Sequence, residues 1–69
     1  RRWLVDTFGR LCVEHWSEQA ECILHTPVAF IRVGMVVHDA DTFVARHGSA
    51  ENAAAWLNAH QVRHAPSPH

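Results

Sequence analysis

The predicted fold depends on residues 28–46, which read VAFIRVGMVVHDADTFVAR. Across residues 28–37 the odd-numbered positions are all apolar, whereas the even-numbered positions include Arg32 and Gly34. This alternation predicts a strand with one buried face. Residues 38–41 supply a turn, because aspartate side chains bond back to their own backbone. Residues 42–46 form a second, shorter strand, so the stretch as a whole predicts a β-hairpin.

A helix is predicted before this hairpin, from Trp3 to about Ala20. The apolar positions there recur every three or four residues, which indicates one face of a helix; they are Leu4, Val5, Phe8, Leu11, Cys12, His15 and Trp16. Pro27 ends any such helix by Thr26, because the residue before proline is pushed toward extended geometry. Residues 21–26 are open to two interpretations, as the last helical turn or as the start of an extended segment.

A second helix is predicted over residues 50–61. Ser49 is a good N-cap, since its side-chain oxygen can accept a hydrogen bond from an amide of the first turn. Glu51 lies near the positive end of the helix dipole. Residues 64–69, His-Ala-Pro-Ser-Pro-His, are expected to be a flexible tail after a single domain of residues 1–63.

The predicted architecture is a small two-layer α+β domain of order α-β-β-α, with the antiparallel hairpin covered by two helices. Laying both apolar helix faces on one side of the hairpin buries all three surfaces. A two-stranded sheet is marginally stable alone. The longer first strand leaves part of its edge unpaired, which invites a third strand from residues 21–26 or from another subunit. We therefore expect a homodimer.

Size and charge limit the classes of function. A chain of 69 residues makes a small core, and such cores are usually supplemented by metals, disulfides or partner subunits. The six Arg are scattered, there is no Lys, and the net charge is −1. This argues against general nucleic-acid binding, which normally shows a basic stripe. Two Cys are too few for a disulfide framework, so we expect reduced thiols and a cytoplasmic location.

Neither a membrane span nor a leader is predicted. The uninterrupted apolar runs, such as residues 28–31, are far short of the roughly 20 residues that cross a bilayer. The start Arg1-Arg2 is followed by Trp-Leu-Val-Asp and not by a long apolar block. The absence of an initiator Met suggests a processed start.

The stretch CVEHWSEQAECILH, residues 12–25, contains Cys-x-x-His twice. Cys12, His15, Cys22 and His25 match in number and type the four ligands that tetrahedral zinc prefers. They can converge only if the chain folds back between the pairs. If one helix runs through, the ligands spread over three turns, and soft residues packed in a core are then the simpler interpretation. We favour packing and keep a zinc-stabilised regulatory domain as an alternative.

We expect no catalysis and no resident cofactor. Cys12 with His15 is the best candidate nucleophile–base pair, but a buried helical pair lacks a pocket and a third group to orient the His. A chain this small rarely encloses a substrate cavity.

The leading hypothesis is a non-catalytic protein–protein interaction module that acts as a regulator, an inhibitor or an accessory or assembly subunit. Tryptophan is enriched at interface hot spots, so Trp3 and Trp16 are candidate partner-binding residues unless they close the small core. Strand-edge pairing adds Val28, Phe30 and Arg32. A further alternative is a weak nucleic-acid-binding regulator that uses Arg1 and Arg2.

Overall fold

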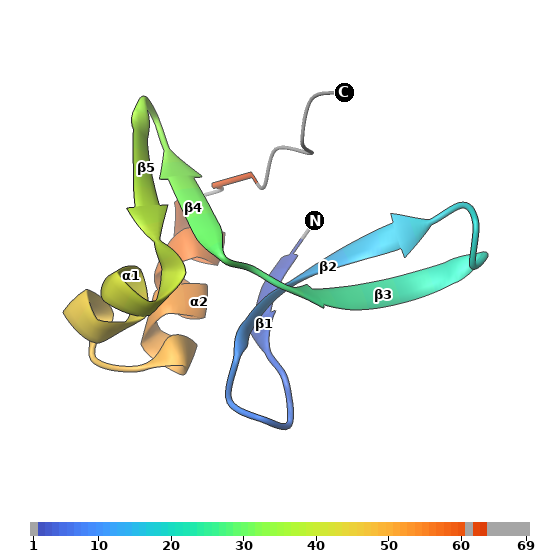
Figure 1. Ribbon diagram of the computed structural model, residues 1–69, viewed down its shortest axis with the longest axis horizontal. Coiled ribbons are helices and arrows are strands. Elements are labelled where there is room, and N and C mark those ends of the chain that lie inside the picture. Colours follow the sequence, from blue (N-terminus) through green and yellow to red (C-terminus); the bar gives the residue numbers. More distant parts are fainter. Residues whose placement is uncertain (1, 61, 64–69) are drawn as a thin grey trace.

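The fold is a small α+β fold with two antiparallel sheets and two helices (Figure 1). The computed structural model describes residues 2–60 and 62–63. The elements are, in order, β1 (Arg2–Val5), β2 (Leu11–Ser17), β3 (Cys22–Pro27), β4 (Phe30–Val33), β5 (Val36–Asp39), α1 (Ala40–His47) and α2 (Ala50–Ala59). The predicted fold class is confirmed at this level, but the predicted α-β-β-α order is wrong, because five strands precede both helices.

The first predicted helix is a β-hairpin. In the β1–β2 pair, Trp3 lies opposite Val13 and Leu4 opposite Cys12. Asp6 makes the turn, since its Oδ1 accepts hydrogen bonds from the amides of Phe8 and Arg10 at 2.9 and 2.8 Å. Gly9 supplies a φ of 79°, which favours glycine. The helical spacing arose because apolar residues of two strands were counted across this turn as one stripe.

Residues 21–26 fall mostly in β3, which resolves the open alternative in favour of the extended form. β3 pairs with β2 from Cys12 opposite Pro27 to Ser17 opposite Cys22. In the turn between them, Ser17 Oγ accepts a hydrogen bond from the Ala20 amide at 3.2 Å. The sheet order is β1-β2-β3, so this third strand completes the N-terminal sheet and does not pair with residues 28–37.

Residues 28–37 do not form one long strand, because the chain reverses at Gly34-Met35. β4 pairs with β5 from Phe30 opposite Asp39 to Val33 opposite Val36. Gly34 has a φ of 62° and occupies the first of the two loop positions, which is where a type II′ hairpin turn requires glycine. The overhanging edge expected from a long first strand is therefore absent from these two strands.

Residues 42–46, the second strand of the predicted hairpin, are helical. Asp39 is the N-cap of α1, and its Oδ2 accepts from the Thr42 amide at 3.2 Å. Gly48 ends the helix in the left-handed conformation, with a φ of 91°. The aspartate chemistry was recognised, but it starts a helix here and does not close a hairpin.

The C-terminal helix is confirmed. Ser49 caps α2 as predicted, with its side-chain oxygen accepting from the Asn52 amide at 3.0 Å. The helix ends at Ala59. Gln61, the last residue of the predicted helix, lies outside the described residues, as do Arg1 and the predicted tail of residues 64–69.

The core gathers where α2 meets β1 and β2 and where α1 meets α2 and the β4–β5 hairpin. Its buried cluster contains Trp3, Leu11, Ile31, Ala40, Phe43, Ala53, Ala54 and Leu57. A pair of hydrogen bonds joins α2 to the outer edge of β1, because the Asn58 side chain accepts from the Trp3 amide and donates to the Trp3 carbonyl, both at 2.8 Å. Among the described residues, no helix has the length and apolar character needed to span a membrane.

Candidate protein-interaction surface

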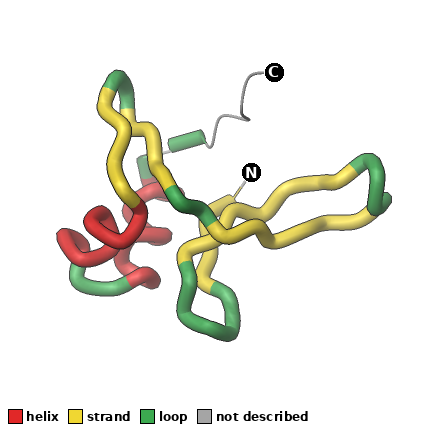
Figure 2. The backbone as a smooth tube through the Cα atoms, in the orientation of Figure 1, coloured by secondary structure: helices red, strands yellow, loops and turns green. Residues whose placement is uncertain are grey.

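The distal half of the β2–β3 hairpin, residues 15–24, which we call the arm, is largely exposed. β1 reaches only as far as Glu14 along β2, so the arm is a two-stranded ribbon that projects away from the helices (Figure 2). Every residue of β3 is exposed. Among the described elements, β3 makes extensive contact with β2 alone. The outer edge of β3 is therefore open to solvent.

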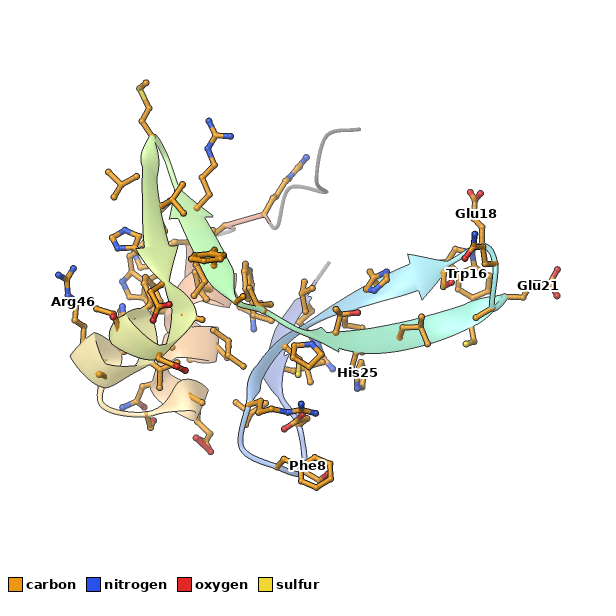
Figure 3. The ribbon with its side chains drawn as sticks, in the orientation of Figure 1. Phe8, Trp16, Glu18, Glu21, His25 and Arg46 are labelled. Atoms are coloured by element: carbon orange, nitrogen blue, oxygen red, sulfur yellow. The ribbon has the colours of Figure 1, made fainter. Side chains whose placement is uncertain are left out.

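Each face of the arm carries a hydrophobic pair or residue. Trp16 and Ile23 lie directly opposite each other on one face, and they are 61% and 57% exposed. His15 and Leu24 form the corresponding pair on the other face, where Leu24 is 39% exposed. Glu18 and Glu21 flank Trp16 at the tip (Figure 3). Trp16 and Ile23 thus give the arm an apolar patch with an acidic end.

A charged network lies at the base of the arm, on the face that carries Trp16. The Glu14 carboxylate contacts His25 Nε2 at 3.1 Å and an Arg2 guanidinium nitrogen at 3.5 Å. All three side chains are on the solvent-exposed part of the sheet, where such pairs contribute little to stability. On the opposite face, His15 Nε2 is 2.8 Å from Thr26 Oγ1. Both histidines therefore have neighbours from the adjoining strand.

The four predicted zinc ligands do not converge. Side chains alternate between the faces of a strand, so Cys12 and His25 lie on one face of the β2–β3 pair, whereas His15 and Cys22 lie on the other. Cys12 is also buried, whereas Cys22 is exposed. Within residues 2–60 and 62–63, no group of three or more His, Cys, Asp or Glu side chains is placed to hold a metal ion. The geometry therefore gives no support to a zinc site at these four residues, and the packing interpretation holds for Cys12 but not for the exposed Cys22.

Cys12 is also poorly suited to nucleophilic chemistry. Burial raises the pKa of its thiol, and the nearby Asp6 carboxylate acts in the same direction. Its Sγ lies 3.6 Å from Asp6 Oδ2 and 3.5 Å from the Arg10 carbonyl. Since the thiolate is the reactive form, a buried thiol held protonated beside a carboxylate is inert. His15, its proposed base, points to the opposite face of the strand.

The two tryptophans predicted to bind a partner differ in burial, because Trp3 is buried and Trp16 is exposed. Trp3 is only 3% exposed and belongs to the core, and its Nε1 donates to the Val62 carbonyl at 2.7 Å. Trp3 therefore helps to close the fold and is not part of an exposed surface. Trp16 is exposed on the arm, as a partner-binding residue must be.

The other predicted partner residues lie on and beside β4. Val28 is partly buried against the core. Phe30 and Arg32 are exposed on the outward face of the β4–β5 hairpin, where Arg32 lies opposite Val37. Phe30 and Val37 are each 62% exposed. This makes a second exposed apolar surface, on a different sheet from the arm.

A shallow pocket of about 550 Å³ lies between the β4–β5 hairpin and the end of α2. The rings of Trp56 and His60 stack in its wall, with centroids 4.1 Å apart, and His60 Nδ1 lies 2.8 Å from the Trp56 carbonyl. The lining residues are Arg32, Val33, Gly34, Trp56, His60, Val62 and Arg63. None of them is a nucleophile or a carboxylate, so the lining supplies no acid–base pair.

Sequence reasoning missed Ile23 and Leu24 as surface residues. The sequence left residues 21–26 open between a helical turn and an extended segment, so it did not place these two side chains on a surface. The signal that could have placed them is Pro27, since proline within a strand is confined to edge strands or bulges. Comparison of this chain with family models, curated proteins and solved structures finds no match.

Proposed function

We propose that this protein is a small, non-catalytic protein–protein interaction module that binds its partner through the arm. It acts as a regulator, an inhibitor or an accessory or assembly subunit. The observation that carries the proposal is the open edge of β3 beside the exposed Trp16–Ile23 pair. Such an edge presents backbone donors and acceptors to an extended segment of a partner, and the apolar pair gives that contact its side-chain anchor.

The edge lacks the usual protection against pairing. Exposed edge strands are commonly blunted by lysines, by inward-pointing charges, by bulges or by proline. β3 reads Cys-Ile-Leu-His-Thr-Pro and contains no Asp, Glu, Lys or Arg. Its one protective residue is Pro27, at the end nearest the body of the fold. The distal part of the edge is therefore suited to strand addition.

Trp16 is the natural anchor of such a contact. Tryptophan is among the residues most enriched at binding hot spots, and a large exposed aromatic side chain contributes little to the stability of an isolated chain. The pair with Ile23 makes a patch that a partner can cover in a single contact. Glu18 and Glu21 at the tip favour a partner whose matching surface is basic or neutral.

We propose a non-catalytic function because neither Cys12 nor the pocket beside α2 offers a catalytic group pair. Cys12 is buried with a raised pKa, and the pocket beside α2 offers only His60 as a proton-transfer group. The low net charge and scattered Arg give no reason to add nucleic acid as a partner. We place the protein in a reducing, cytoplasm-like compartment, because both cysteines are free and Cys22 is exposed.

Site-specific photocrosslinking in the native host tests the proposal. A benzophenone amino acid placed at Trp16 should capture a partner. The matched control is the same group at Phe8, an aromatic residue that is 82% exposed in the β1–β2 turn, well away from the arm (Figure 3). Equal adducts at both positions, or none at Trp16 above background, would contradict the proposal.

A stability measurement separates binding from folding. Trp16→Ser should change the free energy of unfolding by no more than about 0.5 kcal/mol, as surface substitutions usually do. The same substitution should abolish capture by a benzophenone placed at Ile23. A variant that loses both stability and capture would show that Trp16 supports the fold and not the contact.

A further inference from the structure

The outward-facing backbone groups of β3 can be assigned residue by residue. The Val28 amide donates to the Leu11 carbonyl at 3.1 Å. Because hydrogen-bonded and non-hydrogen-bonded pairs alternate along an antiparallel ladder, Cys22, Leu24 and Thr26 direct their N–H and C=O groups toward β2. Ile23 and His25 therefore direct theirs to the open edge. Pro27 also faces that edge, but it has no N–H to donate.

The same alternation holds across the whole sheet. The Asp6 amide donates to the Arg10 carbonyl at 3.0 Å. The backbone groups of Trp3 accordingly point away from β2, where they meet the Asn58 side chain. The outer edge of β1 is thus occupied at Trp3 by a side chain of α2, whereas no bond from another described element reaches the outer edge of β3.

We propose that the edge of β3 pairs antiparallel with the same edge of a second copy of this chain, about a twofold axis at Leu24. This inference rests on the proposed function, because it uses the same open edge, and it names a second copy of this chain as the strand that pairs there. In this register Ile23 lies opposite His25 of the second copy, and His25 lies opposite Ile23 of the second copy. All four outward groups of Ile23 and His25 are then used, which gives four interchain N–H···O=C bonds.

Neighbouring twofold registers are poorer. An axis at Ile23 places His25 opposite Glu21 of the other copy, and Glu21 has a φ of 54° at the arm's turn, so it is not extended. An axis at His25 places Ile23 opposite Pro27, which cannot return a hydrogen bond. Glu21 and Pro27 thus bound a short window that has Leu24 at its centre.

The side chains are compatible with a second copy in this register. A twofold axis brings like residues near each other, so a charged edge would repel itself, but β3 carries no Asp, Glu, Lys or Arg. Leu24 meets Leu24 of the second copy on one face, covering a partly exposed apolar residue. On the other face, Ile23 lies between Trp16 and His25 of the second copy, and the acidic tips lie at opposite ends of the contact.

The contact is one short strand edge from each chain. It is smaller than the roughly 800 Å² per partner that stable complexes bury, so dimerisation should depend on concentration. The preferred register is therefore best detected by trapping. In non-hydrogen-bonded antiparallel pairs the Cα atoms are about 4.5 Å apart, which is within the range that a disulfide bridges.

The experiment compares two single cysteines on the edge. Purified Leu24→Cys and Ile23→Cys variants, each also carrying Cys22→Ser, are incubated in a glutathione redox buffer at equal concentration. The Leu24→Cys chain should form an interchain disulfide at least tenfold faster, because only position 24 meets itself across the axis. In a chain that keeps Cys22, Thr26→Cys should also trap a dimer, because these two positions are opposite in the same register.

A backbone variant tests the hydrogen bonds. Adding His25→Pro to the Leu24→Cys chain removes an outward-facing N–H and should lower the rate of disulfide trapping at least tenfold. Adding His25→Ala keeps the N–H and should leave the trapping rate unchanged. Circular dichroism confirms that both variants fold. Equal trapping at positions 23 and 24, or trapping no faster than in urea, would overturn the pairing. If the purified chain does not pair with itself but Trp16 still captures a host protein, this inference fails and the proposed function stands.

Discussion

The Asn58→Ala substitution tests whether the Asn58 side chain, which bonds the backbone of Trp3, holds α2 against β1. The substitution removes two hydrogen bonds of 2.8 Å, one from the Trp3 amide and one to the Trp3 carbonyl. At about 0.5–1.5 kcal/mol for each bond, the loss is roughly 1–3 kcal/mol. Alanine favours the helix over asparagine by up to about 0.7 kcal/mol, so we expect a net loss of roughly 1–2 kcal/mol.

That loss is large against the roughly 3–5 kcal/mol that a core of this size supplies. The measurement is urea unfolding followed by far-ultraviolet circular dichroism. The matched control is Asn52→Ala, in the same helix, because the Asn52 side chain makes one exposed bond to the His47 carbonyl at 3.0 Å. We expect the control to change stability by less than about 0.5 kcal/mol. An Asn58→Ala variant as stable as the Asn52→Ala variant would refute the reasoning.

Three further predictions concern thiols, acid and a helix end. A maleimide should label Cys22 in the native protein and Cys12 only after unfolding, because the first thiol is exposed and the second buried; native labelling of both would contradict the packing of β2. Hydrogen bonds from the Arg10 amide and side chain and from the Phe8 amide lower the pKa of Asp6. The unfolded chain therefore binds the proton more tightly, and stability should fall as the pH drops below about 4 toward the lowered pKa. Asp6→Asn should reduce this dependence in urea titrations at several pH values, and an unchanged slope would count against it. Gly48→Ala should cost about 1–2 kcal/mol in thermal unfolding, since φ is 91° there, and a neutral result would show that the end of α1 rearranges.

The helix α2 could be predicted because its signals are local. Ser49 caps it and the apolar positions that follow are helical in spacing, and both features act within a few residues of sequence. The alternation around Ile31 was right only in part, because Ile31 is fully buried but Met35 and Val37, from the same predicted face, are 95% and 62% exposed. What local reasoning misplaced was the reversal at Gly34, which splits the alternating stretch into two strands.

The N-terminal half could not be assigned in the same way. Its apolar residues satisfy a helical spacing, but they also form two short apolar runs, residues 3–5 and 11–13, that lie in strands. The turn at Asp6 to Gly9 decides between the two arrangements. The candidate site suffered from the same ambiguity. On a helix, Cys12 and His15 share a face, but on a strand they point in opposite directions. The four expected zinc ligands therefore lie on two different faces, because the segment is a pair of strands and not a helix.

By itself, the sequence determined the class of the fold, the cap and body of α2, and the presence of strand-forming segments, because these depend on short-range hydrogen bonding and side-chain alternation. The tertiary structure decided which tryptophan is buried and which is exposed. Trp3 is covered because α2 packs on β1 and Asn58 holds it there. Trp16 is exposed because β1 ends before the arm and no element covers that part of β2 among the residues that the structure describes. Burial depends on contacts between residues more than fifty positions apart, which no local pattern can specify.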